Sequence, residues 1–323
     1  MWYNPLITIK EDVMSTEIFA TFGPSCREEE TLRNMVAEGL TGMRLNLSHM
    51  TLWDAADYIN AYRNVTDTPK ILIDMQGPEL RVGRADINVE GILDLGDIEL
   101  PKEVLEALKT GDELLLDDGK LLCRMTDLRH AEVIRGGFLA SRKSVKIKGK
   151  NVDMPVLTDH DIANIKAARE YGVTAVMQPF VRSGDDLKKV REILDKNGAA
   201  DIQIYAKIEN RQGVENLPYI LGYCDALVIA RGDLGNDMPL WELPAVQKQI
   251  EDACHKTGKP YIVVTQMLAS MESSPVPTRA EVSDIFHAVY HGAWGVMITG
   301  ESAVGKYPVE AVRYLSKTAK SAE

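Results

Sequence analysis

The chain has 323 residues, of which 45% are hydrophobic and 26% are charged, and its formal net charge at pH 7 is −11. These values are typical of a folded globular protein and exclude a disordered or fibrous chain. The negative charge disfavours nucleic acid and anionic membranes as partners, and no apolar run is long enough to cross a bilayer. Four scattered cysteines without a CxxC pair, and a first segment of 21 residues that does not resemble a secretory signal, predict a cytoplasmic protein.

From residue 17 onward, short apolar runs rich in β-branched residues alternate with longer amphipathic segments, which is typical of repeated βα units. The predicted strands span residues 17–22, 42–47, 70–74, 174–178, 202–208, 226–230, 261–265 and 295–299. The predicted helices span residues 28–38, 52–64, 159–171, 185–197, 213–221, 243–257, 280–290 and 309–322. Thr158 and Ser183 predict helix starts, while Gly172 and Gly258 predict helix ends. This alternation predicts an α/β protein with the (β/α)8 TIM-barrel fold, and a doubly wound open sheet is the alternative.

A long connection, residues 84–153, separates the third predicted strand from its helix and is too long for a loop without structure of its own. Segments 113–123, around Asp118-Gly119, and 132–139, around Gly136-Gly137, each predict a β-hairpin. We therefore expect a small, all-β, barrel-like lid domain at 84–153, inserted into a catalytic barrel formed by 1–83 and 154–323. A βα loop of a barrel opens on the face where such enzymes carry out chemistry, so the insert is expected to cover the site.

The insert carries a cluster of basic residues in an otherwise acidic chain. Five cations fall within nine residues, namely Arg142, Lys143, Lys146, Lys148 and Lys150. Such a cluster indicates either a binding site for a small anion or a solvated basic edge strand, and the sequence leaves both interpretations open.

Charged residues stand at the ends of two neighbouring predicted strands. Lys207 lies at the end of the predicted strand 202–208 and Glu209 follows it directly, and alternation along a strand sends both to the same side, either as an active-site pair or as a structural ion pair. Asp233 follows the strand at 226–230 between two glycines, where backbone can approach a ligand closely. Two carboxylates are the usual protein share of a Mg²⁺ site, so Glu209 and Asp233 predict a divalent metal site at the carboxyl-terminal rim of the barrel.

Seven motifs, taken in order, resemble the pyruvate kinase family over the chain from about residue 21 to its end. They are Arg44-Leu-Asn-Leu-Ser-His49, Gly77-Pro-Glu-Leu-Arg81, Lys207-Ile-Glu-Asn210, Ala230-Arg-Gly-Asp-Leu-Gly235, Thr265-Gln-Met-Leu268, Pro277-Thr-Arg-Ala-Glu281 and Gly300-Glu301. The resemblance implies transfer of a phosphoryl group from phosphoenolpyruvate to ADP, giving pyruvate and ATP in the last step of glycolysis. It also implies Mg²⁺ or Mn²⁺, together with K⁺, as cofactors.

The same resemblance implies a role for individual residues. The implied catalytic residues are Arg44, Lys207, Thr265, Thr299 and Glu301. The implied substrate-binding residues are Arg44, Lys207, Gly232, Asp233 and Thr265. The implied nucleotide-binding residues are Asn46, His49, Arg81 and Lys143. Mg²⁺ would lie on Glu209 and Asp233, and the residues implied for K⁺ are Asn46, Ser48, Asp74 and Met75.

Several positions depart from the family pattern. Met50, Met75, Gln76 and Ser144 stand where glycine, threonine, lysine and glycine are usual. Two alternatives therefore stay open. One is a metal-dependent lyase or aldolase that acts on a pyruvate enolate with the same Glu209 and Asp233, and the other is a catalytically inactive homologue that binds a metabolite. We also expect an abbreviated lid, no carboxyl-terminal domain and hence no sugar-phosphate activation through it, and a homodimer formed through barrel surfaces.

Overall fold

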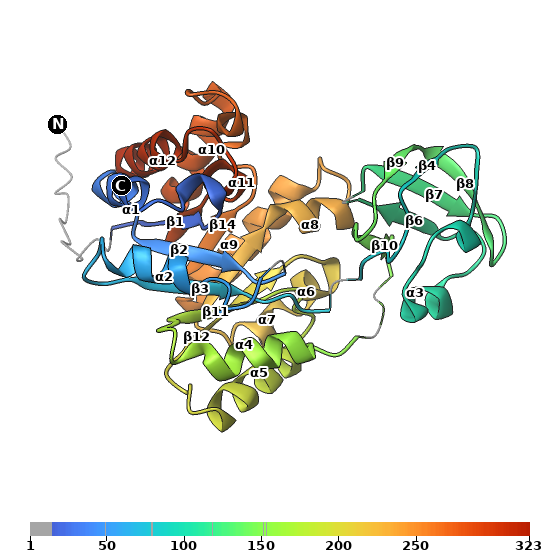
Figure 1. Cartoon of the computed structure of the whole chain (residues 1–323), viewed down its shortest axis with the longest axis horizontal. Helices are drawn as coiled ribbons and strands as arrows, with labels where there is room; N and C mark the ends of the chain where they lie inside the picture. Colours follow the sequence, from blue (N-terminus) through green and yellow to red (C-terminus); the bar gives the residue numbers. More distant parts are fainter. Residues whose placement is uncertain (1–14, 49, 79, 118, 151, 153) are drawn as a thin grey trace, which may run out of the picture. The chain divides into compact units, whose positions relative to one another are not determined.

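The computed structural model describes residues 15–323 apart from residues 49, 79, 118, 151 and 153 (Figure 1). Eight parallel strands form a closed barrel in the order β1-β15-β14-β13-β12-β11-β3-β2. Their bounds are β1 Glu17–Thr21, β2 Gly42–Asn46, β3 Lys70–Asp74, β11 Ala175–Gln178, β12 Gln203–Ile208, β13 Ala226–Ala230, β14 Tyr261–Val264 and β15 Gly295–Met297. The predicted TIM barrel is confirmed, and the open sheet is wrong because the strand order closes on itself.

The contacts within the chain divide it into two units. The first unit comprises Met1–Arg44, Asp57–Lys70 and Pro260–Glu323, and the second comprises Leu45–Ala56 and Ile71–Lys259. In the first unit β1 pairs in parallel with β15, and in the second unit β11 pairs in parallel with β12. The second unit also holds β13, whose five residues are all buried, as expected for a parallel strand that is covered on both faces.

Close packing around Phe19 explains two glycines of the first unit. Phe19 is fully buried on β1, and its ring lies between Gly42 on β2 and Gly295 on β15. A Cβ atom would lie 2.7 Å from the ring at Gly42 and 2.9 Å from it at Gly295. Both contacts are too short for carbon atoms, so glycine at these positions lets the aromatic ring fill the space between neighbouring strands.

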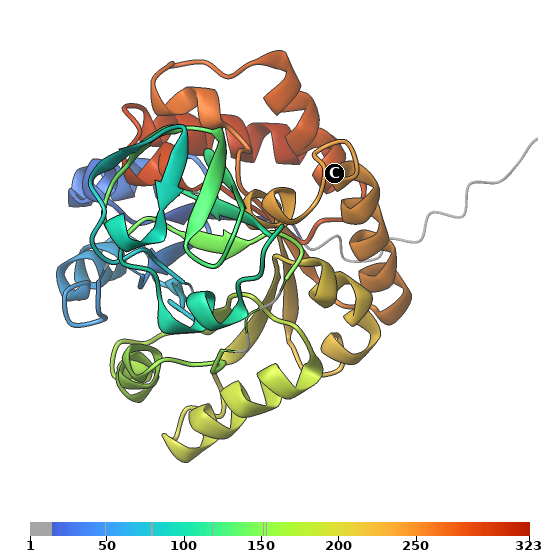
Figure 2. The same cartoon turned by 90° about the vertical axis from the view of Figure 1, so that its right-hand side faces the viewer.

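The barrel strands are connected mainly by helices, which Figures 1 and 2 show in two views at right angles. Their bounds are α1 Glu29–Ala37, α2 Ala56–Arg63, α4 Asp159–Ala168, α5 Gly184–Lys196, α6 Arg211–Glu215, α7 Leu217–Ile220, α8 Arg231–Asp237, α9 Leu243–Thr257, α10 Arg279–Tyr290, α11 Gly300–Ala303 and α12 Pro308–Ala322. Short 3-10 turns span Pro24–Cys26, Leu95–Asp97 and Ala269–Glu272. In the described part of the chain, every helix is too short or too polar to span a bilayer.

Most predicted helices are confirmed, and the differences have local causes. The helix predicted at 213–221 is two short helices, α6 and α7, because Pro218 stands in the first turn of α7 and lacks the N–H that a continuous helix requires. Thr158 caps α4 as predicted, whereas Ser183 makes no capping bond at α5, where the Asp186 carboxylate instead accepts the Arg182 N–H. Gly258 adopts the left-handed conformation expected at a helix end, with φ of 64°.

In its described residues, the insert between β3 and α4 contains seven short strands and one short helix. Their bounds are β4 Ile87–Val89, β5 Ile92–Asp94, α3 Lys102–Ala107, β6 Glu113–Leu116, β7 Leu121–Met125, β8 His130–Arg135, β9 Gly137–Leu139 and β10 Val145–Ile147. Five strands form an antiparallel sheet in the order β10-β6-β7-β8-β5, and β4 pairs with β9. The sequence did not predict α3. The division of the chain at residues 83 and 153 stays a prediction.

One of the two hairpins predicted in the insert is confirmed. β6 and β7 pair antiparallel, with Leu116 opposite Leu121, and of the predicted turn residues Asp118 lies outside the described residues. The second hairpin is wrong, because β8 and β9 belong to different sheets. A Cβ atom on Gly136 would lie 2.3 Å from the Val89 carbonyl oxygen, so glycine lets the chain pass beside β4 as it leaves one sheet for the other.

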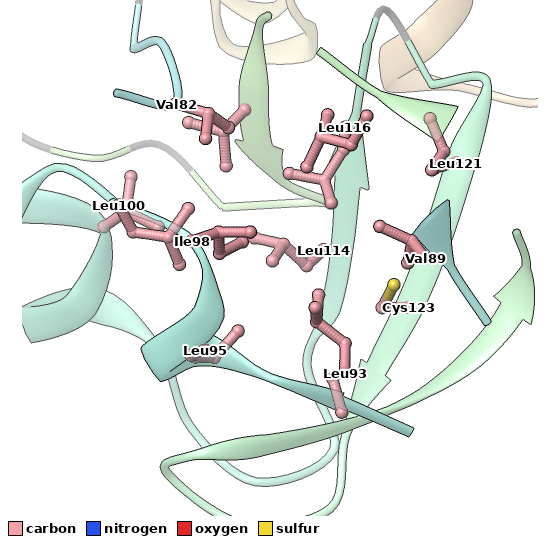
Figure 3. Close-up of a cluster of buried hydrophobic side chains, with 14 of the residues drawn as sticks. Val82, Val89, Leu93, Leu95, Ile98, Leu100, Leu114, Leu116, Leu121 and Cys123 are labelled. Carbon is pink, nitrogen blue, oxygen red and sulfur yellow. The ribbon is translucent and has the colours of Figure 1, made fainter. Parts of the chain in front are cut away.

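The insert has a hydrophobic cluster of its own, shown in part in Figure 3. Leu114 and Leu116 on β6 face inward with Leu121 and Cys123 on β7, since alternate residues of a strand point to the same side of the sheet. Each fully buried leucine contributes about 2 kcal/mol relative to an exposed one. The cluster therefore holds the sheet together and gives β10, at its edge, a fixed support.

Candidate active site

Three charged side chains meet at the carboxyl ends of β3 and β12 in the second unit. The Lys207 Nζ atom lies 3.1 Å from Asp74 Oδ1 and 2.9 Å from Glu209 Oε1. The exposed fractions of the side chains are 13% for Lys207, 3% for Asp74 and 1% for Glu209. Since burying charges away from water is costly unless they are paired, each of these groups depends on the others. The structure thus brings together three of the predicted site residues.

The second oxygen of Glu209 is held by backbone from the neighbouring strand end. Glu209 Oε2 accepts a hydrogen bond of 2.7 Å from the Phe180 N–H. Phe180 follows β11 and has a φ of 52°, in the left-handed region that a large side chain rarely adopts. This conformation accompanies the orientation of the N–H toward the carboxylate, so Phe180 belongs to the site, although no motif in the sequence pointed to it. Strained backbone of this kind is concentrated at functional sites.

The environment of Glu209 carries an excess of negative charge. Burial raises the pKa of Glu209 to about 7, the Lys207 ammonium lowers it, and the charges of Asp233 and Asp74 raise it again. One lysine therefore faces three carboxyl groups. A divalent cation would offset the remaining negative charge and favour the ionised form of Glu209.

Asp233 lies in the first turn of a helix and not at a strand end. The prediction placed it after β13 in a segment turned by glycines, but the chain enters α8 directly at Arg231. Gly232, the predicted contact for the substrate carboxylate, occupies the same turn. The helix went unpredicted because Gly232 and Gly235 both disfavour helical structure in isolation.

The donor set of Glu209 and Asp233 fits a Mg²⁺ or Mn²⁺ ion. Both residues supply carboxylate oxygens, and the pKa of Glu209 is raised first by burial and then by the negative charges of Asp233 and Asp74. Among the described residues, no group of three or more His, Cys, Asp or Glu side chains is arranged to enclose an ion. The protein would therefore provide two acids, with water and substrate oxygens completing the coordination.

The residues implied for K⁺ lie on two segments of the second unit that are joined by a backbone hydrogen bond. The Leu47 N–H donates to the Asp74 carbonyl at 2.9 Å, and the Ser48 N–H donates to Asn46 Oδ1 at 3.1 Å. Met75 is buried and donates its N–H to the Met177 carbonyl. The segment after β2 is thus held against the end of β3. His49, predicted to bind the nucleotide, lies outside the described residues.

A polar cavity of about 580 Å³ contains two of the residues predicted to bind a nucleotide. Its lining comprises Ser48, Met50, Thr51, Asp54, Gln76, Arg81, Ser141, Arg142, Lys143 and His160. Arg81 donates to the Arg142 carbonyl at 2.9 Å, and Lys143 lies 3.1 Å from Asp117. Three cations and a single carboxylate line this cavity, so its charge suits an anionic ligand.

The lysines of the basic cluster in the insert each form an ion pair with a carboxylate. Lys148 lies 2.5 Å from Glu113 and Lys150 lies 2.5 Å from Asp112, so both form ion pairs inside the insert beside the edge strand β10. For these two the edge-strand interpretation is the better one. Lys143 lines the polar cavity. Lys146 differs from all of these, because its partner is Asp237 on α8.

In the first unit, Arg44 is held at the end of β2 by a threonine that the sequence did not single out. Arg44 Nη1 donates to Thr21 Oγ1 at 3.0 Å, and Thr21 Oγ1 donates in turn to the Ile298 carbonyl at 3.1 Å. Thr21 is buried at the end of β1. A hydroxyl that accepts from a guanidinium and donates to a carbonyl fixes the direction of the arginine side chain.

Glu301 joins the segments that follow β14 and β15. Its Oε1 accepts the Leu268 N–H at 3.0 Å, and its Oε2 accepts the Thr299 N–H at 2.6 Å and faces Thr299 Oγ1 at 3.3 Å. Glu301 is buried, and Thr265 and Gln266 have φ values of 81° and 56°. A β-branched residue at positive φ is strained, so Thr265 is maintained in this conformation by its surroundings. The hydrogen bonds of Glu301 Oε2 show that two of the residues predicted as catalytic, Thr299 and Glu301, are in direct contact.

Asp161 is a further buried carboxylate, and it was not among the site residues predicted from the sequence. It accepts hydrogen bonds from the backbone N–H groups of Gln76 at 2.8 Å, Gly77 at 3.0 Å and Thr158 at 2.9 Å. It thereby joins the segment after β3 to the start of α4. The signal was present in the pattern Thr158-x-x-Asp161, which also forms a capping box at α4.

Residues 13–312 match the family described as "Pyruvate kinase, barrel domain". The chain belongs to the pyruvate kinase family. Curated pyruvate kinases of Clostridium perfringens and Thermococcus litoralis are 35% and 37% identical to it, over 96% and 95% of this chain and 71% and 70% of their own lengths. The pyruvate kinase of Sporosarcina psychrophila is 35% identical over 95% of this chain and 57% of its own length. The chain thus spans between about half and three quarters of these relatives.

Proposed function

We propose that the chain is a phosphotransferase of the pyruvate kinase type, which converts phosphoenolpyruvate and ADP into pyruvate and ATP. The observation that carries the proposal is the buried Lys207 held between Asp74 and Glu209, with Asp233 near enough to raise the pKa of Glu209. The family membership supports the same reaction, and neither the lyase nor the inactive homologue has a specific observation in its favour.

Phosphoryl transfer depends on positioning and on neutralising charge more than on covalent chemistry. Arg44 and Lys207 would bind the transferring phosphoryl group, and the Gly232 N–H would bind the substrate carboxylate. As the phosphorus leaves, Lys207 would stabilise the developing enolate oxygen, where preorganised charge has its largest effect. Thr265 would lie beside the methylene carbon, and the hydroxyl of Thr299, held by Glu301, would take part in proton delivery.

Cofactors would complete this arrangement. Mg²⁺ or Mn²⁺ on Glu209 and Asp233 would supply charge neutralisation for the phosphoryl and carboxylate oxygens. Asn46, Ser48 and Asp74, with the Met75 carbonyl, would bind K⁺. We further propose that Arg81 and Lys143, both in the polar cavity, bind the nucleotide phosphates together with Asn46 and His49. A cytoplasmic location and a homodimer formed through barrel surfaces complete the proposal.

A coupled assay tests the reaction. The full chain is mixed with phosphoenolpyruvate, ADP and Mg²⁺, with and without K⁺, and pyruvate is followed by its reduction in the presence of lactate dehydrogenase. We expect pyruvate formation well above that of the Lys207→Met variant. Equal rates for the two chains would refute the proposed function, and phosphoenolpyruvate binding without turnover would favour the inactive homologue.

A further inference from the structure

One carboxylate on α8 joins three elements of the second unit. Asp237 is the last residue of α8, and its side chain is 8% exposed. Its Oδ1 lies 2.8 Å from Lys146 Nζ on strand β10 of the insert, and its Oδ2 accepts the Arg211 N–H at 2.6 Å. Both oxygens of a buried carboxylate are thus engaged, by partners from two different segments.

Asp237 is linked to the segments that carry both acids of the proposed metal pair. Arg211 begins α6 directly after Glu209 and Asn210, so the hydrogen bond to its N–H holds the segment that carries Glu209. Asp233 lies four residues before Asp237 on the same helix, and residues four apart share one face of a helix. A change in the position of Asp237 would therefore alter the spacing of Glu209 and Asp233.

The insert reaches this carboxylate through Lys146. Lys146 and Asp233 line the same cavity, of about 120 Å³, with Phe180 and Asn210. The turn between β6 and β7 also approaches α8, since a Cβ atom on Gly119 would lie 3.2 Å from Asn236 Oδ1. The insert is thus in contact with the helix that carries Asp233 at both of these points.

We propose that Asp237 is a positioning residue that couples the insert to the metal pair through its ion pair with Lys146. The proposal rests on the proposed metal site at Glu209 and Asp233. With Lys146 in place, α8 and the start of α6 are held at the spacing that two carboxylates need to share one ion. Without it, Asp237 loses the partner on one side and the spacing relaxes. On this proposal, the lysine of the insert raises the affinity of the site for a cation.

The sign of this effect separates positioning from simple charge. Lys146 is a cation that lines the same cavity as Asp233, so Coulomb repulsion alone predicts tighter metal binding when it is replaced by methionine. Loss of positioning predicts weaker binding. Lys148 provides the matched control, because it is a lysine two residues away whose ion pair with Glu113 stays within the insert.

The test is a Mn²⁺ titration of the full chain, followed by the electron paramagnetic resonance signal of the free ion. We expect Lys146→Met to weaken Mn²⁺ binding by about tenfold, the lower end of the loss usual for groups that orient metal ligands. Lys148→Met should stay close to the wild type, and Lys146→Arg should restore most of the affinity. In an Asp237→Asn background, Lys146→Met should cause no further weakening.

Unchanged or tighter Mn²⁺ binding by Lys146→Met would overturn the proposal, and so would a lower melting temperature without any change in affinity. A wild-type chain that binds no Mn²⁺ would overturn the proposed metal site and this inference with it. A wild-type chain that binds Mn²⁺ in this pattern but forms no pyruvate would refute only the proposed reaction.

Discussion

At the scale of single residues, the site depends on charges that are buried and paired. Lys207 is almost fully enclosed between Asp74 and Glu209, and Asp233 adds negative charge to the same surroundings. Groups placed in this way keep their charges only while every partner is present. The same contacts therefore hold the fold together and would provide the electrostatic environment of the proposed reaction.

Replacing Lys207 with methionine should affect both activity and stability. We expect a loss of pyruvate formation of about 1000-fold or more, because the group proposed to stabilise the enolate oxygen is removed. Two buried carboxyl groups lose their cation, so the free energy of unfolding should fall by about 3 kcal/mol, and the pKa of Glu209 should rise further. Steady-state rates and denaturant unfolding measure the two effects. Lys188→Met, at an exposed ion pair with Asp185, should change neither.

Alanine substitutions at two glycines with positive φ distinguish the cost of backbone strain from the cost of a steric clash. Gly77 has a φ of 60°, and a Cβ atom there would lie 2.4 Å from Pro179 Cγ, whereas Gly91 has a φ of 64° with nothing within 4 Å. Gly91→Ala should therefore destabilise the chain by about 1 kcal/mol, the cost of the left-handed conformation alone. Gly77→Ala should cost at least about 2 kcal/mol more, because the proline ring cannot move aside. Similar unfolding free energies for both variants would contradict this account.

At the scale of elements, the site is assembled by groups that join neighbouring strand ends. Glu301 holds the segments after β14 and β15 together, and Asp161 holds the segment after β3 against α4. Both are buried carboxylates that accept backbone N–H groups, which would otherwise be left without partners inside the protein. The rim of the barrel is therefore held by side chains as well as by backbone pairing.

Removing the Asp161 carboxylate tests its structural role. Asp161→Ala leaves the N–H groups of Gln76, Gly77 and Thr158 without their acceptor, and we expect a loss of about 3 kcal/mol in the free energy of unfolding. Asp159→Ala is the matched control, since it removes an acid from the same first turn of α4 and should cost only about 0.5 kcal/mol. Equal losses in urea unfolding would show that the carboxylate acts only through the helix dipole.

At the scale of the whole molecule, the four cysteines report on burial throughout the chain. Cys26, Cys123, Cys224 and Cys254 are all buried and free, and burial raises their pKa values to about 11, 11, 11 and 12. One of them, Cys123, belongs to the cluster of the insert and the other three do not. The four thiols therefore report on folding in the first unit, in the insert, and in the barrel part of the second unit.

The thiols should stay unreactive toward a disulfide reagent in the folded chain at pH 8 and should all react in denaturant, because only the thiolate is the nucleophile. The pKa values are higher in the folded state than in the unfolded state, so above pH 9 the unfolded chain binds fewer protons than the folded one. The free energy of unfolding should consequently fall as the pH rises from about 9 to 11. Rapid labelling of any thiol without denaturant would contradict the burial described here.

The sequence by itself predicted the architecture well because each signal is local. The predicted strand 70–74 is β3 and the predicted strand 226–230 is β13, since short apolar runs are typical of strands covered on both faces. The helix predicted at 243–257 is likewise confirmed, because α9 starts and ends at the predicted residues. Local rules failed where tertiary contacts overrode them, at α8 with its two glycines and at the second hairpin of the insert.

For the site, the sequence determined which chemical groups are present and along which strands they lie. Lys207 and Glu209 could be placed on one side of the chain at the end of β12 by alternation alone, and Asp233 could be assigned to the segment that follows β13. Only the tertiary structure decided that Asp74 is the second partner of Lys207 and that the Phe180 N–H binds Glu209. It also decided that Lys146 pairs with Asp237 on α8 and not with a carboxylate of the insert. Each of these contacts joins residues far apart in the chain, and no periodicity within one segment records which distant partner will lie within hydrogen-bonding distance.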